Sequence, residues 1–218
     1  MKSPWLGSLA AALLALAAQP ALAQRDPARS MRLDDPPSLP EDLRKLDRFS
    51  RCVAQRQANP SAALLAMDFR AEGYESGLRR LAQGNRGCAP LGRLAFGGVL
   101  FAGGMAEALL QRSGASMDVA ARTALDPARP PLQARDENEL MGICTVRAAP
   151  ALVQGLLATE VASPEEAAAI RALMPQVGQC LTAGINLRVN RPALRAALAL
   201  ATYRIVQHNA AATPAARN

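Results

Sequence analysis

Hydrophobic residues recur every three to four positions in several stretches of the chain, which is the spacing of one face of an α-helix. The clearest stretch carries Ile170, Leu173, Met174, Val177 and Leu181. No long run of the sequence alternates apolar and polar residues as a half-buried β-strand does. The pattern therefore predicts an all-α fold.

Residues that favour helix starts precede these stretches. The segment Ser163–Glu166 combines an N-cap side chain, a proline in the first turn and acids at the positive end of the helix dipole. Asp136 is a second N-cap, and Glu139 completes a capping box with it. Pro175 lies inside the helix that starts at Ser163 and indicates a kink or an early end there.

A longer period links the two halves of the chain. Cys52 and Cys88 are 36 residues apart, Cys144 and Cys180 are also 36 apart, and the second pair follows the first by 92 residues. Other residues match at the same offset: Leu64-Leu65-Ala66 with Leu156-Leu157-Ala158, Asp68 with Glu160, Leu78-Arg79 with Ile170-Arg171, and Leu81 with Leu173. Since internal repeats decide architecture, this pattern predicts two homologous four-helix repeats, each closed by one disulfide.

The predicted organisation follows from these repeats. The first repeat covers 40–112 and the second covers 136–208. A proline-rich linker, 113–135, separates them, because its prolines interrupt helices. The polar, proline-rich segment 24–39 is expected to be a disordered tether, and 209–218 a flexible tail.

The first 23 residues have the features of a secretory signal peptide. Lys2 supplies the positive charge, Trp5–Ala18 is an apolar run of 14 residues, and Ala21–Ala23 is a small-x-small cleavage site before Gln24. The run is shorter than the ~20 residues that span a bilayer, so no transmembrane span is expected after cleavage. The expected location is the periplasm, with secretion beyond it left open.

In an exported chain an even number of cysteines predicts disulfides. Four cysteines allow three pairings, and the repeat favours Cys52–Cys88 with Cys144–Cys180. Metal or redox sites usually hold two cysteines close together, as in C-x-x-C, and this chain has no such motif. Its single histidine, His208, lies near the C-terminal end. We therefore expect structural disulfides, no metal and no cofactor.

The repeated acid and arginine are the candidate polar contacts. Asp68 and Glu160 follow the second helix of their repeats, whereas Arg79 and Arg171 lie on the third. Two interpretations remain open at this point. The favoured one is an acid–arginine bridge inside each repeat. The other makes the two arginines paired anion contacts in a groove between the repeats.

Composition and charge limit the classes of partner that we expect for this protein. The 218 residues are 50% hydrophobic and 3% aromatic, with a formal net charge of +7. The arginines are scattered and no nucleic-acid-binding module is present, so no nucleic-acid partner is expected. Weak contact with anionic lipid headgroups or polysaccharide is compatible with the charge. The apolar run Leu94–Ala106 contains Gly97-Gly98 and Gly103-Gly104, which predict a buried, closely packed helix, with a small apolar pocket or groove as the alternative.

No recognised catalytic motif points to a reaction, neither a G-x-S-x-G elbow, an H-E-x-x-H pair nor a phosphate-binding glycine loop. We therefore expect a non-enzymatic periplasmic binding protein, with a protein partner or a small amphiphile held between the repeats. One alternative is a structural or envelope-surface protein. The other is an enzyme with an unrecognised site, which a cleft with two convergent carboxylates would favour.

The second repeat also resembles a known group of sequences. The unit from Cys144 to Cys180, with Leu156–Thr159, Ser163–Glu166 and Ile170–Leu173 between them, resembles uncharacterised exported proteins of alphaproteobacteria. The segment Leu194-Arg195-Ala196-Ala197-Leu198-Ala199 is similar to their final helix. The resemblance covers both repeats, although the first is more diverged. It implies export and this architecture, and it implies no activity and no site residue.

Overall fold

The computed structural model describes residues 39–89, 96–127, 129–183 and 190–211. Helices make up 76% of these residues and none of them lies in a strand, which confirms the all-α prediction. The predicted signal peptide, almost all of the predicted tether and most of the predicted tail lie outside the described residues.

The described residues form the following helices in chain order. They are α1 (Pro40–Arg56), α2 (Ala58–Ala66), α3 (Tyr74–Gly84), the 3₁₀ turn η2 (Arg86–Cys88), α4 (Gly98–Arg112), the 3₁₀ turn η3 (Ala115–Met117), α5 (Val119–Thr123), α6 (Glu137–Ala148), α7 (Pro150–Ala158), α8 (Pro164–Gln179) and α9 (Arg191–Ala211).

The predicted helix starts form as the sequence indicates. The Asp136 side chain accepts a hydrogen bond from the Glu139 backbone N–H, and the Ser163 hydroxyl accepts one from Glu166 N–H. Glu139 Oε2 accepts at 2.7 Å from the backbone N–H of Arg135, the residue before the N-cap, so the reciprocal bond of the predicted capping box forms one residue earlier than in the standard motif. α8 does not end early at Pro175. It continues to Gln179, held by buried apolar side chains on both sides of the proline.

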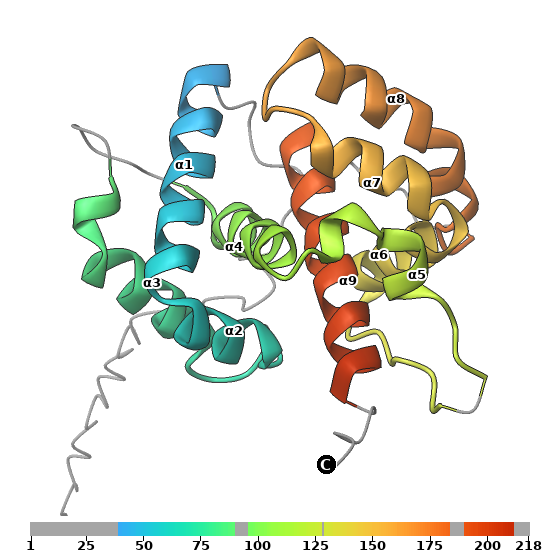
Figure 1. The fold of residues 1–218 in the computed structure, drawn as a ribbon, viewed down its shortest axis with the longest axis horizontal. Coiled ribbons are helices and arrows are strands. Elements are labelled where there is room, and N and C mark those ends of the chain that lie inside the picture. Colours follow the sequence, from blue (N-terminus) through green and yellow to red (C-terminus); the bar gives the residue numbers. More distant parts are fainter. Residues whose placement is uncertain (1–38, 90–95, 128, 184–189, 212–218) are drawn as a thin grey trace, which may run out of the picture.

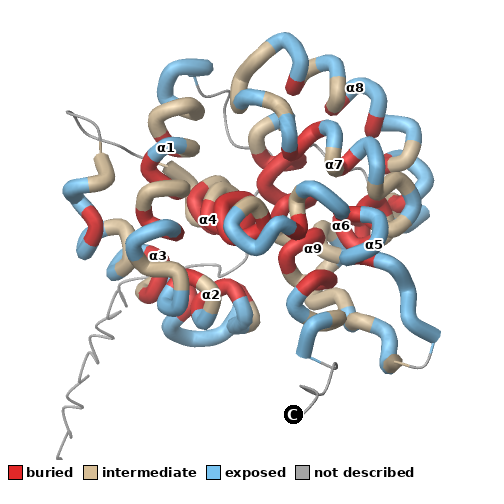
Figure 2. The backbone as a smooth tube through the Cα atoms, in the orientation of Figure 1, coloured by how far each residue is buried: buried red, intermediate tan, exposed pale blue. Residues whose placement is uncertain are grey.

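The centre of the molecule is the crossing of α4 and α9 (Figure 1). α1 packs on α4, and α6 packs on α9. The tube coloured by burial is mostly red along α4 and α9, whereas the outer helices alternate between red, tan and pale blue (Figure 2). A helix that is covered on all sides needs small and apolar side chains around its whole circumference, which explains the Ala-, Leu- and Gly-rich sequences of these two.

Glycine lets α4 approach its neighbours closely. A Cβ at Gly103 would lie 2.4 Å from Ala196 Cβ of α9, and one at Gly104 would lie 2.7 Å from Ser50 Cβ of α1. Both distances are far below ordinary carbon–carbon contact. The close, buried packing predicted for this apolar run is confirmed for its part in α4, whereas residues 94–95 lie outside the described part of the chain.

The interval 113–135, predicted as a linker, contains helical structure. η3 and α5 lie in it, and Ala115 and Val119 are fully buried. α5 packs against α7 and α9, so these apolar side chains complete the core. Five residues are too few for a helical period to be visible in the sequence, and the burial depends on these tertiary contacts.

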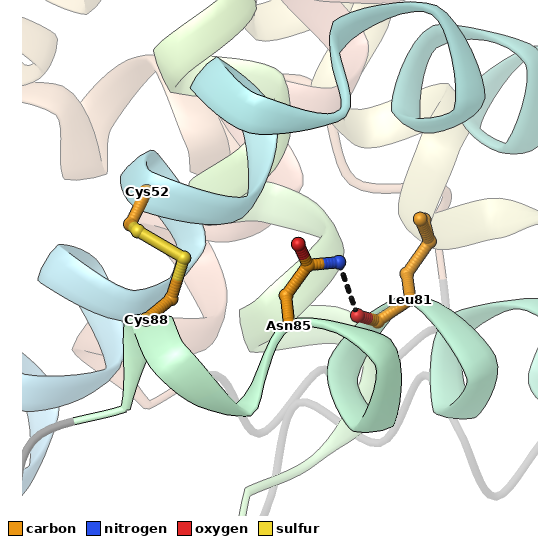
Figure 3. Close-up of a disulfide and its surroundings, with 4 residues drawn as sticks. All are labelled: Cys52, Leu81, Asn85 and Cys88. Atoms are coloured by element: carbon orange, nitrogen blue, oxygen red, sulfur yellow. Dashed lines mark hydrogen bonds between the residues drawn. A yellow bond between two sulfur atoms is a disulfide. The ribbon is translucent and has the colours of Figure 1, made fainter.

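Two disulfides tie the helices, and their pairing confirms the prediction. Cys52 of α1 joins Cys88 of η2, and Cys144 of α6 joins Cys180 at the end of α8, each with a Cα–Cα distance of 5.6 Å. Beside the first bridge, the Asn85 amide donates to the Leu81 carbonyl at 2.8 Å and closes the end of α3 (Figure 3). Two disulfides indicate that the protein folds in an oxidising compartment.

Candidate functional site

The first predicted acid–arginine bridge does not form. Asp68 pairs with Arg70, two residues away, at 2.8 Å. The Asp68 carboxylate also accepts from the Arg70 backbone N–H at 2.9 Å, so a local turn after α2 captures it. Hydrogen bonds from the Arg70 side chain lower the pKa of Asp68 to about 2, against a smaller opposing effect of burial. Arg79 is exposed on α3 and has no side-chain partner among the described residues.

The second predicted bridge is replaced by a contact to another helix. Glu160 lies 3.7 Å from Arg44 of α1. Arg171 is exposed on α8 and makes no ion pair with a described residue. The four predicted contacts therefore do not meet in their predicted pairs, because the third helix of each half turns its arginine toward solvent.

A different group of charged residues is buried where the central helices cross. Glu107 lies in the middle of α4, Arg195 in α9 and Glu166 in the first turn of α8. Their side chains are only 3%, 5% and 6% exposed, respectively. Ions buried this deeply persist only when they are paired and hydrogen-bonded.

Arg195 holds both carboxylates. Its Nε and Nη2 donate to Glu107 at 2.9 and 2.7 Å, and its Nη1 donates to Glu166 at 3.0 Å. The hydroxyl and the carbonyl of Thr159 accept from Nη1 and Nη2, both at 3.0 Å. Burial alone would lower the pKa of Arg195, but the two carboxylates outweigh it and raise that pKa.

The carboxylates have further partners. Arg51 Nη2 of α1 lies 3.2 Å from Glu107, while its Nε binds Asp47 at 3.0 Å. Glu166 Oε2 accepts from Ala162 N–H at 2.9 Å, and Ala162 has a positive φ of 58°. The cluster therefore connects α1, α4, α8 and α9 through one continuous set of charge-assisted hydrogen bonds.

The space beside this cluster is small. Glu107, Glu166, Arg195 and Asp47 line a cavity of about 50 Å³, enough for one or two water molecules. Ligand pockets are ~300–1,000 Å³. The two carboxylates converge, as an enzyme with an unrecognised site would require, but each is bound by Arg195 and faces a cavity too small for a substrate. Their geometry is that of a buried ion-pair cluster that holds the helices together, and we call Glu107, Glu166 and Arg195 the structural lock.

The sequence contained a signal for this lock. Glu107 interrupts the apolar run of α4, and Arg195 lies between Leu194 and Leu198 in the apolar pattern of α9. One acid and one arginine, each inside an otherwise apolar helix, predict a buried ion pair when the two helices pack together.

The largest hollow among those described is a groove between α2 and α3, with a volume of about 470 Å³. A Cβ at Gly77 would lie 2.5 Å from Leu64 Cδ1, so this glycine lets the leucine side chain lie between the helices. A Cβ at Gly84 would meet no atom within 4 Å and would project into open space. Arg80 is the charged side chain among its described lining residues, which are Gln57, Pro60, Ala63, Leu64, Met67, Gly77, Arg80, Leu81, Gly84 and Asn85.

Taken singly, no helix among the described residues is long and apolar enough to cross a membrane, and α6 with α7 reaches that length and composition only as a pair bent by 102°. Within the same residues, no three His, Cys, Asp or Glu side chains are grouped to hold a metal ion.

No protein-family model, no curated protein and no solved structure matches this chain.

Proposed function

We propose that the protein is a non-enzymatic binding protein of the periplasm, built from two duplicated four-helix halves, and that the groove between α2 and α3 receives the apolar part of a small amphiphile. The observation that carries this proposal is the volume of the groove, about 470 Å³. That volume lies within the range of small-molecule sites. The cavities between the halves, about 50 and 30 Å³, are too small for such a ligand.

The duplication is supported by the bounds of the helices. Moving α2 by 92 residues gives 150–158, which are the bounds of α7. The same shift places the start of α4 one residue before that of α9. The packing of α1 on α4 corresponds to that of α6 on α9, and both disulfides join positions 36 residues apart. A chain that repeats its contacts in this way is expected of two fused copies of one unit.

The sequence difference between the halves supports a site on α3. Gly77 and Gly84 correspond, at the 92-residue offset, to Ala169 and Gln176 of α8. Glycine in a helix costs about 1 kcal/mol relative to alanine. Gly77 carries this cost inside α3, where it makes room for the Leu64 side chain, whereas Gly84 is the last residue of α3 and leaves the space beside it open.

The groove also indicates the chemistry of its ligand. Its floor is formed by side chains such as Leu64, Met67 and Leu81, which suit an alkyl chain. Arg80 at its side suits an anionic headgroup. We therefore infer an anionic amphiphile, with its chain in the groove and its headgroup near Arg80.

The proposal is tested with the oxidised protein and the apolar fluorescent probe N-phenyl-1-naphthylamine. We expect saturable binding and displacement of the probe by decanoate. Gly84→Leu fills the groove and should weaken probe binding at least about tenfold, since an occupied site excludes the ligand. Gly155→Leu on α7 is the matched control, because a Cβ there also meets nothing within 4 Å. Equal binding by wild type and Gly84→Leu would overturn the proposal.

Arg80→Gln distinguishes recognition of the anionic headgroup from binding of the alkyl chain. It should leave probe binding unchanged and weaken displacement by decanoate, because only the anionic ligand interacts with the guanidinium. Displacement that is insensitive to this substitution would contradict the anionic class while leaving the groove itself in place.

A further inference from the structure

Three arginines lie beside the groove between α2 and α3. Arg80 lines the groove, and its guanidinium donates to the neutral hydroxyl of Ser76 at 3.0 Å. A Cβ at Gly87 would lie 3.4 Å from Arg56 Nη1, so the guanidinium at the end of α1 lies against η2, next to Arg86. All three arginines are exposed, and none of them forms an ion pair with a described residue.

The chain holds Arg56 and Arg86 at the groove. Gln57, which follows Arg56, and Asn85, which precedes Arg86, are both lining residues. The first disulfide joins α1 to η2 and fixes these two segments against each other (Figure 3). We call Arg56, Arg80 and Arg86 the arginine rim, because they come from three different elements and border one groove.

No acid offsets this charge along the segments that form the groove. The sequence has no aspartate or glutamate between Asp47 and Asp68, and none between Glu75 and Glu107. Every described residue that lines the groove belongs to one of these two stretches. A surface that carries charge of one sign attracts partners of the opposite sign, so this face favours an anionic partner.

The second half of the chain lacks the rim. At the 92-residue offset, each of the three rim arginines is replaced by a residue without a charged side chain, namely Ala148, Ala172 and Gly178. Arg79, which lies outside the rim, keeps its charge as Arg171. The rim is therefore not explained by the arginine content of the duplicated unit, and it occurs in the half that has the groove.

Exposed apolar surface accompanies the rim. Met67 of the groove wall is 37% exposed, and Ala63 of the same wall is exposed as well. Cations beside apolar groups suit the interface of an anionic bilayer, where charged headgroups and alkyl chains occur together. An acidic protein or polysaccharide offers the charge but not the alkyl chains.

We propose that the arginine rim docks on the surface of an anionic lipid bilayer, with the open side of the groove facing the headgroups. The amphiphile that we propose for the groove then enters and leaves at the membrane. The choice of a bilayer over other anionic surfaces rests on the proposed function, because it uses the alkyl-chain site. The rim and its absence of acids stand without it.

The test is co-sedimentation of the oxidised protein with sucrose-loaded vesicles of phosphatidylglycerol and phosphatidylcholine in equal amounts. We expect binding to these vesicles and much weaker binding to pure phosphatidylcholine. Sodium chloride at about 0.5 M should release the protein, because salt screens exposed charges. Arg56→Gln/Arg86→Gln should weaken binding about 30-fold, at about fivefold for each arginine near an anionic surface.

Arg122→Gln/Arg171→Gln is the matched control. It removes two exposed arginines from α5 and α8, which lie on the opposite side of the molecule from α3 (Figure 1). This variant has the same net charge as the rim variant, and it should bind the anionic vesicles much more strongly. Equal losses in the two variants, or equal binding to vesicles with and without phosphatidylglycerol, would overturn the proposal.

The groove and the rim can be tested separately. Gly84→Leu blocks the groove and should not weaken vesicle binding. Arg56→Gln/Arg86→Gln should leave the binding of N-phenyl-1-naphthylamine unchanged, because neither arginine lines the groove. Absence of probe binding alone would contradict the groove, whereas absence of vesicle binding alone would contradict the docking surface.

Discussion

Glu107 of α4 and Arg195 of α9 form a two-pronged ion pair, with Nε–Oε2 and Nη2–Oε1 distances of 2.9 and 2.7 Å. The two residues are 88 positions apart in the chain and lie where the two central helices cross. A bidentate pair fixes both the sliding and the rotation of one helix against the other, because each hydrogen bond has a preferred direction. The crossing that holds the two groups of helices together therefore contains a polar lock inside an apolar core.

Arg195→Met tests this lock. The substitution leaves Glu107 and Glu166 buried without their cation, and removing one partner of a buried ion pair costs about 3–5 kcal/mol. We expect the free energy of unfolding to fall by that amount in urea denaturation followed by circular dichroism at 222 nm. Arg171→Met, on the exposed face of α8, should change it by about 0.5 kcal/mol or less.

The double variant Glu107→Met/Arg195→Met extends the same test. Replacing both ions of a buried pair by apolar residues is often close to neutral, so part of the lost stability should return. If the double variant is as unstable as Arg195→Met alone, the loss comes from disrupted packing and the unpaired charge of Glu107 is not its cause.

Gly103→Ala tests the close approach of α4 to α9. The added Cβ would lie 2.4 Å from Ala196 Cβ and 2.5 Å from Ala196 Cα, so the backbone of one helix has to move. Overpacking of this kind costs about 1–3 kcal/mol, and thermal unfolding should show it. Gly178→Ala on α8 meets nothing within 4 Å and should be neutral or stabilising by up to about 1 kcal/mol. Equal midpoints for the two variants would contradict the observed helix separation.

Much of the fold could be predicted because its signals are local. The N-caps at Asp136 and Ser163, the helical spacing of apolar residues and the cysteine spacing each depend on neighbours in the sequence or on one fixed offset. The same offset led to the disulfide pairing that the structure has. Local propensity also identified the apolar part of α4 as a buried, closely packed helix.

The candidate sites could not be predicted in the same way. Asp68 was expected to reach Arg79, but a nearer arginine, Arg70, competes for it. The place of Arg195 in the apolar pattern of α9 signals its burial, but its pairing with Glu107 depends on how α9 is positioned against α4, which no local pattern specifies. The groove beside Gly84 depends on what does not pack against α3, and sequence periodicity does not report empty space.

Alkaline titration tests the burial of Tyr74. Burial raises the pKa of Tyr74 to about 12 and also raises that of Tyr203. The folded state therefore keeps the Tyr74 proton when the unfolded state loses it near pH 10. This contribution to stability is complete below pH 10 and is lost as the pH rises toward 12, by about 2 kcal/mol. Absorbance at 295 nm should show that the Tyr74 phenolate forms only well above pH 10.

Tyr74→Phe provides the control for this pH dependence. The variant should lose less stability than wild type between pH 10 and 12, because Phe has no proton to release. Titration of both tyrosines at the ordinary pKa in the folded protein would contradict the buried position of Tyr74.

The two disulfides should stabilise the protein to a similar degree. Each closes a loop between cysteines 36 positions apart, and chain entropy gives about 4 kcal/mol for such a loop, with 2–4 kcal/mol common in practice. Replacing Cys52 and Cys88 by alanine should therefore cost about as much free energy of unfolding as replacing Cys144 and Cys180. Urea denaturation of both variants, beside wild type with and without reductant, measures these losses. Unequal losses would show that native packing around one bridge dominates over loop length, and an unchanged midpoint in reductant would contradict a stabilising role for either bridge.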